Sequence, residues 1–367
     1  MRRIRIFYSL ILSVYIAFSS VAFAQKKEQP LRIAVAGVSH GHLWDVVSRI
    51  DRGDFVVVGV SEADDQIRVN NGLYKKLDIS LFYASLEEML DKTQPEVAVA
   101  YGSIYDHLAV VEACAPRGIH VMVEKPLVVS LDHAQRMAEL ADKHQIKIIT
   151  NYETTWYPTN HEAKWMIDSG LIGEITRINV YDGHQGPFEI GCGKEFTDWL
   201  TDPVLNGGGA VIDFGCYGAN LATWLMNGQR PVSVYAVLKQ QKPHLYPKVD
   251  DDATIVVEYP NATVQIMASW NWPINRKDMH IYGSKGYIYQ DTKEKMRLYT
   301  NKKETNPVPV ALEAPYNDVF YYLKAVVREE IEMKPYDLSA LDNNLIVVEI
   351  LQAAIQSHKT GEVIRFK

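Results

Sequence analysis

Short apolar segments alternate with helical segments along residues 32–150. Ser85, followed by Glu87 and Glu88, indicates one helix start, because acidic residues favour a first helical turn. Such alternation predicts a parallel, doubly wound α/β sheet. The strand-like segments are 33–36, 55–60, 97–100, 121–123 and 146–150, and apolar residues recur at helical spacing in 44–50, 107–115 and 131–144.

The pattern changes after Asn151. A helical segment comes first, and strand-like segments then follow one another, separated by turn signals such as Pro260-Asn261. This order predicts an α+β domain with a large, mostly antiparallel sheet. We therefore place a first domain at 25–150 and a second at 151–367. The second domain's helices are expected at 162–169 and 344–358, and its strands at 175–181, 232–238, 253–259, 263–270 and 277–282.

Residues 1–24 have the pattern of an export signal. Three arginines precede an apolar stretch at 7–23, which ends in the small-x-small sequence Ala22-Phe23-Ala24. We expect cleavage before Gln25 and a periplasmic mature protein, with membrane contact only through the cleaved signal. A non-cleaved membrane anchor is the alternative.

Charge and cysteine content exclude several classes of partner. The net charge is −7, and removal of the three signal arginines brings it to −10. A strongly acidic chain does not favour nucleic acid or an anionic membrane surface. Cys114, Cys192 and Cys216 are widely spaced and form neither a disulfide framework nor a zinc motif, so the sequence predicts no metal site.

The stretch RIAVAGVSHGHLW at 32–44 is a strand that turns into a helix. A dinucleotide-binding G-x-G-x-x-G turn would need glycine where this chain has Gly37, Ser39 and His42, and Gly41 stands one position early. Backbone amides at such a turn bind a pyrophosphate, and the Ser39 hydroxyl can add a donor. We expect a variant cofactor-binding turn that also includes His40. A tight turn without a ligand is the alternative.

Two further strand ends carry charged residues. Glu62 ends the second strand, 25 residues after Gly37, where an acidic residue binds the ribose hydroxyls of NAD and repels the 2′-phosphate of NADP. Glu124-Lys125-Pro126 ends the fourth strand, at the edge where such sheets bind ligands. Pro126 interrupts the strand and directs Lys125 toward the crevice.

Together these motifs resemble the Gfo/Idh/MocA oxidoreductases, a family that includes glucose–fructose oxidoreductase and inositol dehydrogenase. The resemblance covers essentially the whole mature chain. It implies a Rossmann domain, a second domain with a mostly antiparallel sheet, a nicotinamide cofactor, a sugar or polyol substrate, and a homo-oligomer, dimer or tetramer. It is carried by residues 37–42, Glu62, EKP at 124–126, GGGAVIDFGCYGANL at 207–221 and YGSKGYI at 282–288.

The resemblance also suggests residue roles. Lys125 resembles the family lysine between nicotinamide and substrate hydroxyl, and Asp213 resembles the substrate-binding aspartate. Tyr217 stands where many members have a histidine base, and a tyrosine at this position resembles the glucose–fructose oxidoreductase and dihydrodiol dehydrogenase branches. His107 and Glu124 are expected beside the cofactor.

The chemistry needs a base for the hydroxyl proton. Asp213 and Tyr217 are four residues apart, so on one helix they face the same way. A neighbouring Lys125 ammonium is expected to lower the pKa of the tyrosine, ordinarily near 10, toward neutrality. The triple glycine at 207–209 is expected to let the backbone approach a ligand closely. His184 is a rival base, expected to contact the substrate first.

Three aromatic residues are candidates for the sugar site. Tyr152, Trp156 and Trp199 lie in the second domain or at its start. Their faces can stack on sugar rings, although packing in the core is the alternative.

Export constrains the function, because no nicotinamide pool is expected outside the cytoplasm. The leading hypothesis is an exported oxidoreductase that acts on a secondary hydroxyl of a sugar or glycoside with tightly bound NAD, NADP being less favoured. A redox-neutral, NAD-dependent glycosidase is the second hypothesis. A non-catalytic sugar-binding protein is the third.

Overall fold

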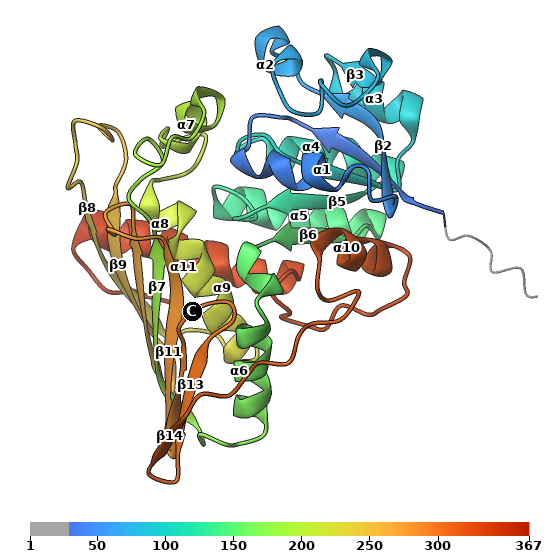
Figure 1. Ribbon diagram of the computed structural model, residues 1–367. Helices are drawn as coiled ribbons and strands as arrows, with labels where there is room; N and C mark the ends of the chain where they lie inside the picture. Colours follow the sequence, from blue (N-terminus) through green and yellow to red (C-terminus); the bar gives the residue numbers. More distant parts are fainter. Residues whose placement is uncertain (1–28, 367) are drawn as a thin grey trace, which may run out of the picture.

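The computed structural model describes residues 29–366, which form two domains built on two sheets (Figure 1). The predicted signal peptide at 1–24 lies outside the described residues. Within them, no helix combines the length and the apolar character needed to cross a membrane.

The first domain is a six-stranded parallel sheet in the order β3-β2-β1-β4-β5-β6. This is the classic order of a Rossmann fold and confirms the predicted fold class. The prediction missed the short edge strand β3. The strands are β1 Leu31–Ala36, β2 Phe55–Ser61, β3 Phe82–Tyr83, β4 Val97–Ala100, β5 His120–Glu124 and β6 Ile148–Asn151.

Helices connect these strands, and local signals in the sequence set their ends. Ser85 is the N-cap of α3, and its hydroxyl accepts a hydrogen bond from the Glu88 amide at 3.2 Å. Ser130 caps α5 in the same way, and α5 coincides with the predicted helix. The helices are α1 Trp44–Arg49, α2 Asp65–Val69, α3 Leu86–Thr93, α4 His107–Cys114 and α5 Leu131–His144.

The second domain has a nine-stranded sheet in the order β14-β13-β12-β11-β7-β10-β9-β8-β15. Among the described strands of this second sheet, only the β7–β10 pair is parallel, so the sheet is mostly antiparallel, as predicted. Its strands are β7 Ile175–Gly183, β8 Ser233–Lys239, β9 Asp252–Glu258, β10 Thr263–Ser269, β11 Arg276–Gly283, β12 Gly286–Gln290, β13 Met296–Thr300, β14 Lys303–Thr305 and β15 Ile364–Arg365.

Helices cover one face of this sheet, and the last part of the chain joins the two domains (Figure 1). The helix α10 follows β14 of the second sheet but packs on the first domain, where the centroid of the Phe320 ring lies 4.5 Å from that of the Phe55 ring of β2. The predicted boundary near residue 150 stays a prediction. The helices are α6 Pro158–Asp168, α7 Lys194–Leu200, α8 Ala210–Asp213, α9 Gly215–Leu225, α10 Val319–Val327 and α11 Leu341–Thr360.

Candidate active site

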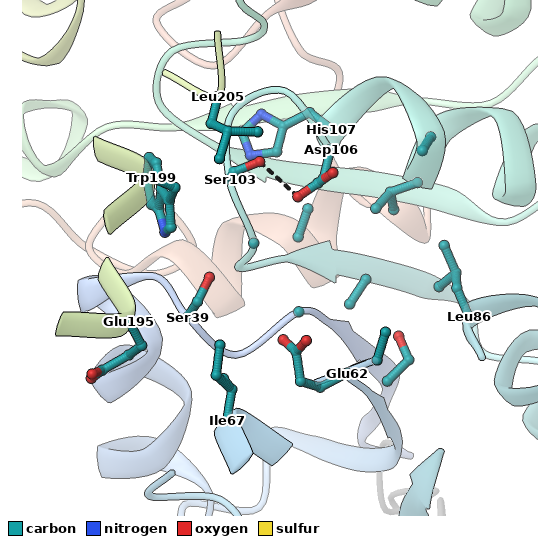
Figure 2. A pocket seen from close by; sticks show the side chains of 18 of the residues that line it. Ser39, Glu62, Ile67, Leu86, Ser103, Asp106, His107, Glu195, Trp199 and Leu205 are labelled. Carbon is teal, nitrogen blue, oxygen red and sulfur yellow. Dashed lines mark hydrogen bonds between the residues drawn. The ribbon is translucent and has the colours of Figure 1, made fainter. Parts of the chain in front are cut away.

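A cavity of about 570 Å³ lies at the carboxyl ends of β1, β2 and β4 (Figure 2). It brings together four of the residues predicted to bind a cofactor, and α7 of the second domain faces them across the cavity. In a doubly wound sheet, this edge is where a dinucleotide binds. The cavity is lined by Gly37, Ser39, Glu62 and His107 of the first domain and by Glu195, Asp198, Trp199 and Leu205 of the second, among others.

Gly37 makes the turn after β1 possible. Its φ is +77°, a left-handed conformation that side chains disfavour. A Cβ at this position would lie 2.7 Å from the Cα of Gly102, which follows the neighbouring strand β4. The glycine therefore allows two loops at the sheet edge to touch, and this contact forms the floor on which a pyrophosphate can sit.

Glu62 is held at the tip of β2 with its carboxylate lining the cavity. One carboxylate oxygen accepts the Val38 amide at 3.2 Å, and the other accepts the Asp64 amide at 3.1 Å. A carboxylate has about four acceptor positions, so two remain for ribose hydroxyls.

His107 presents an unused acceptor. Its Nδ1 donates to the Leu127 carbonyl at 3.0 Å, which places the lone pair of the neutral ring on Nε2. Nε2 is buried without a hydrogen-bond partner among the described residues. Burial lowers the pKa of His107, so the ring is neutral and can accept a hydrogen bond from a ligand amide.

His40 connects the cofactor turn to the second domain. Its Nδ1 accepts the His42 amide at 3.0 Å, and its ring packs 5.1 Å from Phe196 and 5.4 Å from Trp199. Burial lowers the pKa of His40 well below its usual value. Trp199 therefore lies against the turn and lines the dinucleotide cavity; its role as a sugar platform stays a prediction.

His42 belongs to a buried hydrogen-bonded chain. Its Nδ1 lies 2.8 Å from Glu124 Oε2, and Asn151 donates to Glu124 Oε1 at 2.8 Å. The Trp156 indole in turn donates to Asn151 at 3.2 Å, and its ring packs on Tyr322 of α10. Burial opposes the charge of Glu124, yet His42 and the hydrogen bonds lower its pKa overall. Trp156 thus anchors the chain that holds Glu124.

Among the described residues, one group of side chains has the donor atoms to hold a metal ion, and it consists of His40, His42 and Glu124. Donor atoms of His40, His42 and Glu124 lie within 4.8 Å of one another. His40 Nδ1 accepts a backbone amide and His42 Nδ1 is engaged with the carboxylate, so these atoms satisfy each other without an ion. The expectation of no metal site stays a prediction.

Lys125 is held by Asp213 in the interior. Its Nζ donates to the Asp213 carbonyl at 2.9 Å and to the Asp213 carboxylate, and the Trp270 indole donates to the other carboxylate oxygen at 2.9 Å. Burial works against both charges. The pair outweighs it, so the pKa of Lys125 is raised and that of Asp213 is lowered. The structure brings together these two predicted residues as a charged pair.

The helix carrying Asp213 and Tyr217 is broken, contrary to the prediction. The helix α8 ends at Asp213 and α9 begins at Gly215, and the Tyr217 amide donates to the Phe214 carbonyl at 3.1 Å. A continuous helix would use the Asp213 carbonyl for that bond. The break leaves this carbonyl for Lys125.

Tyr217 lies beside Lys125 but is not activated by it. The Lys125 Nζ is 5.2 Å from the Tyr217 ring centroid. Burial raises the pKa of Tyr217 well above 10, and the charge of Glu153 adds to the effect. The expected pKa near neutrality is therefore wrong for this structure, because desolvation of the phenolate outweighs the lysine.

His184 is poised as a donor. Its Nδ1 accepts the Gly186 amide at 2.9 Å, so the neutral ring carries its proton on Nε2. Burial lowers its pKa, although the Asp213 charge opposes this, and the ring packs edge-on to Phe214 at 4.9 Å. A ring protonated at Nε2 favours substrate contact over the role of base.

Tyr152 supports Tyr217. Its hydroxyl donates to Asn344 of α11 at 2.9 Å, and its ring lies edge-on to Tyr217 at 5.5 Å. Its hydroxyl is thus already used within the protein, while its assignment to the sugar site stays a prediction.

The triple glycine serves the chain itself. A Cβ on Gly209 would lie 1.7 Å from the Asp250 carbonyl oxygen. The Asp250 carboxylate accepts the Gly209 and Val211 amides at 2.8 and 2.7 Å. The expected approach to a ligand is therefore wrong at Gly209: its missing side chain admits Asp250, which caps α8 and so positions Asp213.

Sequence reasoning missed Lys277 near Tyr217, together with its neighbours Glu153 and Asp182. Lys277 Nζ lies 4.9 Å from the Tyr217 ring centroid and pairs with the Glu153 carboxylate. Asp182 is opposite Lys277 on the adjacent strand. A signal existed: Lys277 is in phase with buried Met279 and Ile281, so the alternation in β11 puts a charge on the inward face.

Comparisons with known proteins identify the family. The family model described as "Oxidoreductase family, NAD-binding Rossmann fold" matches residues 31–152, and the one described as "GFO/IDH/MocA C-terminal domain" matches 160–289. The chain belongs to the Gfo/Idh/MocA oxidoreductases. The predicted family, and with it the oxidoreductase class, are confirmed.

Curated relatives are distant. The D-xylose 1-dehydrogenase [NADP(+)] of Haloarcula marismortui is 24% identical over 64% of this chain and 64% of its own length. The trans-1,2-dihydrobenzene-1,2-diol dehydrogenase of Xenopus tropicalis is 26% identical over 70% of this chain and 73% of its own. The chain thus matches just under two thirds of the length of the first relative.

Solved structures share the fold across both domains. An aldose-aldose oxidoreductase from Caulobacter crescentus, complexed with glycerol, has a TM-score of 0.77 at 18% identity and covers 92% of this chain and 100% of its own. An inositol dehydrogenase homolog from Azotobacter vinelandii, complexed with NAD+, has a TM-score of 0.79 at 16% identity, over 92% and 98%. At this identity the likeness shows the fold.

Proposed function

We propose that this protein oxidises a secondary hydroxyl of a sugar or related polyol, and that the hydride passes to a nicotinamide dinucleotide. The observation that carries the proposal is the buried Lys125–Asp213 pair beside Tyr217, which joins the domain that carries the cavity residues Gly37, Ser39 and Glu62 to the second domain. The relatives act on a sugar and on a diol by their names, which supports this substrate class.

The residues of the site have different roles in the oxidation of a hydroxyl and in the reverse reduction of a carbonyl. The dinucleotide, when bound, supplies the acceptor for the hydride. The Lys125 ammonium is positioned to donate a hydrogen bond to the substrate oxygen, and His184 Nε2 can donate another. Because Tyr217 is protonated at neutral pH, it is ready to give a proton to a carbonyl, whereas oxidation needs its phenolate.

We further propose that the cofactor is NAD and that it stays tightly bound. Glu62 lines the cavity with free acceptor positions, and a carboxylate there disfavours a 2′-phosphate. Trp199 and its neighbours on α7 cover the other side of the cavity. Tight binding would suit the proposed export to the periplasm, where a free cofactor is not supplied.

We also propose a homo-oligomer built through the outer face of the nine-stranded sheet. Aromatic side chains stack on one another along that face, for example Tyr287 with Tyr289 at 4.4 Å and with Tyr299 at 5.0 Å. Such an aromatic surface is typical of interfaces. Light scattering of the purified protein tests this proposal, and a monomeric mass contradicts it.

The first experiment is to purify the protein from Gln25 onward, denature it without added cofactor and identify any released nucleotide. Stoichiometric NAD or NADH supports the proposal, and NADP contradicts the role of Glu62. Absence of nucleotide, together with no binding of added NAD, leaves the sugar-binding hypothesis. Glycoside cleavage by the NAD-loaded protein without net reduction would instead identify the redox-neutral glycosidase.

A further inference from the structure

Two ammonium groups approach the ring of Tyr217. Lys125 Nζ lies 5.2 Å and Lys277 Nζ 4.9 Å from the ring centroid. Each lysine has a carboxylate partner, Asp213 for Lys125 and Glu153 for Lys277. Tyr217 is therefore shared by two lysine–carboxylate pairs, of which the proposed reaction uses only the first.

Asp182 adds a buried carboxyl to the second pair. It lies directly opposite Lys277 in the β7–β11 register, and both side chains project from the inward face of the sheet. Asp182 is 1% exposed, and neither carboxyl oxygen has a hydrogen-bond partner among the described residues. Buried polar atoms are normally hydrogen-bonded. The described residues supply no partner for this carboxyl, so a bound molecule is a natural partner for it.

Glu153 is the solvent-exposed member of this second group. Its side chain is 50% exposed, whereas that of Lys277 is 13% exposed. Its carboxylate also accepts the Tyr157 hydroxyl at 2.5 Å. Glu153 therefore marks the side from which a substrate hydroxyl would approach Lys277 and Asp182.

The charges near Tyr217 are matched. Burial raises the pKa of Asp182 well above its usual value, which favours the protonated form, and a protonated carboxyl can both donate and accept a hydrogen bond. Each positively charged side chain in the pairs below has a carboxylate partner, so none of these charges is left to bind an anionic substrate. The pairs are Lys125 with Asp213, Lys277 with Glu153 and Arg276 with Asp278.

We propose that Lys277, Glu153 and Asp182 form a second hydroxyl-binding group, which holds another hydroxyl of the substrate while the first is oxidised at Lys125. The substrate class is then an uncharged polyhydroxylated ring, and sugar acids and sugar phosphates are disfavoured. This inference rests on the proposed function, because it assigns the first hydroxyl to Lys125.

The test compares one-hydroxyl and many-hydroxyl probes on the NAD-loaded protein. The probes are cyclohexanol and myo-inositol, and D-glucose with D-glucuronate tests charge. We measure kcat/KM from reduction of the bound nicotinamide, and Kd by calorimetry on the same samples. We expect the preference for myo-inositol over cyclohexanol to fall about tenfold in Lys277→Met, mainly through KM, since the variant loses a charged hydrogen-bond donor to the substrate.

Controls separate binding from folding. Lys285→Met removes an exposed lysine on the turn before β12, and its preference should equal that of the unaltered protein. Glu153→Gln alters a half-exposed member of the group. This variant should therefore still fold if a variant of a buried residue does not. Its preference should also fall.

An unchanged preference in Lys277→Met and Glu153→Gln overturns the inference, as does better use of D-glucuronate than D-glucose. If NAD is bound but no probe reduces it, the proposed function fails, and the calorimetric preference still tests the second group. Absence of binding of both D-glucose and myo-inositol to the unaltered protein overturns the second group.

Discussion

The two lysine–carboxylate pairs at Tyr217 differ chiefly in burial. The side chains of Lys125 and Asp213 are 6% and 7% exposed, whereas those of Lys277 and Glu153 are 13% and 50% exposed. A buried pair keeps its charges only while both partners remain, but a pair that opens to water is screened. The first pair can therefore hold a reacting oxygen in one geometry, and the second can adapt to what binds beside it.

The largest expected difference is in stability. Lys125→Met leaves the Asp213 carboxylate buried without its partner and should cost about 3–5 kcal/mol of unfolding free energy. Lys277→Met should cost about 0–1 kcal/mol, because Glu153 remains solvated. Urea unfolding of both variants measures this, and equal losses would show that burial does not distinguish the pairs.

Tyr217→Phe should lower the rate of oxidation by about 10²–10⁴-fold at alkaline pH, the range for loss of a general base. Because burial raises the pKa of Tyr217, the unaltered protein should oxidise faster as pH rises through the alkaline range. The Phe variant should lose this increase. A rate that levels off near neutral pH in the unaltered protein would contradict the assignment.

Asp213 and Asp182 should affect stability with opposite pH dependence. The pKa of Asp213 is lowered, so its stabilisation is present above the unfolded value of about 3.9 and is lost as pH falls. The pKa of Asp182 is raised by burial, so its contribution is full below that value and declines as pH rises.

Thermal unfolding across acid to neutral pH, compared with Asp213→Asn and Asp182→Asn, measures both trends. The advantage of the unaltered protein over Asp213→Asn should shrink toward acid pH. Its advantage over Asp182→Asn should shrink toward neutral pH. Parallel trends would mean that the two carboxyls share one protonation state.

The smallest expected effect is at Glu153. Glu153→Gln should change the unfolding free energy by less than about 1 kcal/mol, as for a half-exposed ion pair. Added salt should reduce the difference further, because it screens exposed charges. A loss of unfolding free energy as large as that of Lys125→Met would contradict this, because Glu153 would then contribute as much stability as a member of the buried pair.

Much of the fold was predictable from local pattern. The apolar strands at β1, β2, β4 and β5, and the helix α5 with its Ser130 cap, follow from periodicity and capping, which act over a few residues. The strand β3 has only two residues and carries no periodic signal. The helix α10 was missed for a different reason, since its burial depends on the distant first domain.

The candidate site was predictable where motifs mark it. Gly37, Glu62, Lys125 and Asp213 lie at strand ends or in glycine-rich turns, and the structure brings each of them to the same edge of the molecule. The predicted pKa of Tyr217 was wrong because desolvation depends on how many atoms surround the phenol. That number is set by the folded structure and cannot be read from the sequence.

The sequence by itself determined the two sheets, the strand ends that carry Glu62 and Lys125, and the membership of the oxidoreductase family, because each depends on residues close together in the chain. Only the tertiary structure decided that Lys277 meets Tyr217 and that Asp182 lies opposite Lys277, since β7, α9 and β11 are far apart in sequence. It also decided that the pKa of Asp182 is raised by burial, whereas the pKa of Asp213 is lowered because its pairing with Lys125 outweighs burial. Protonation depends on burial and on the nearest opposite charge, and both arise only when the chain has folded.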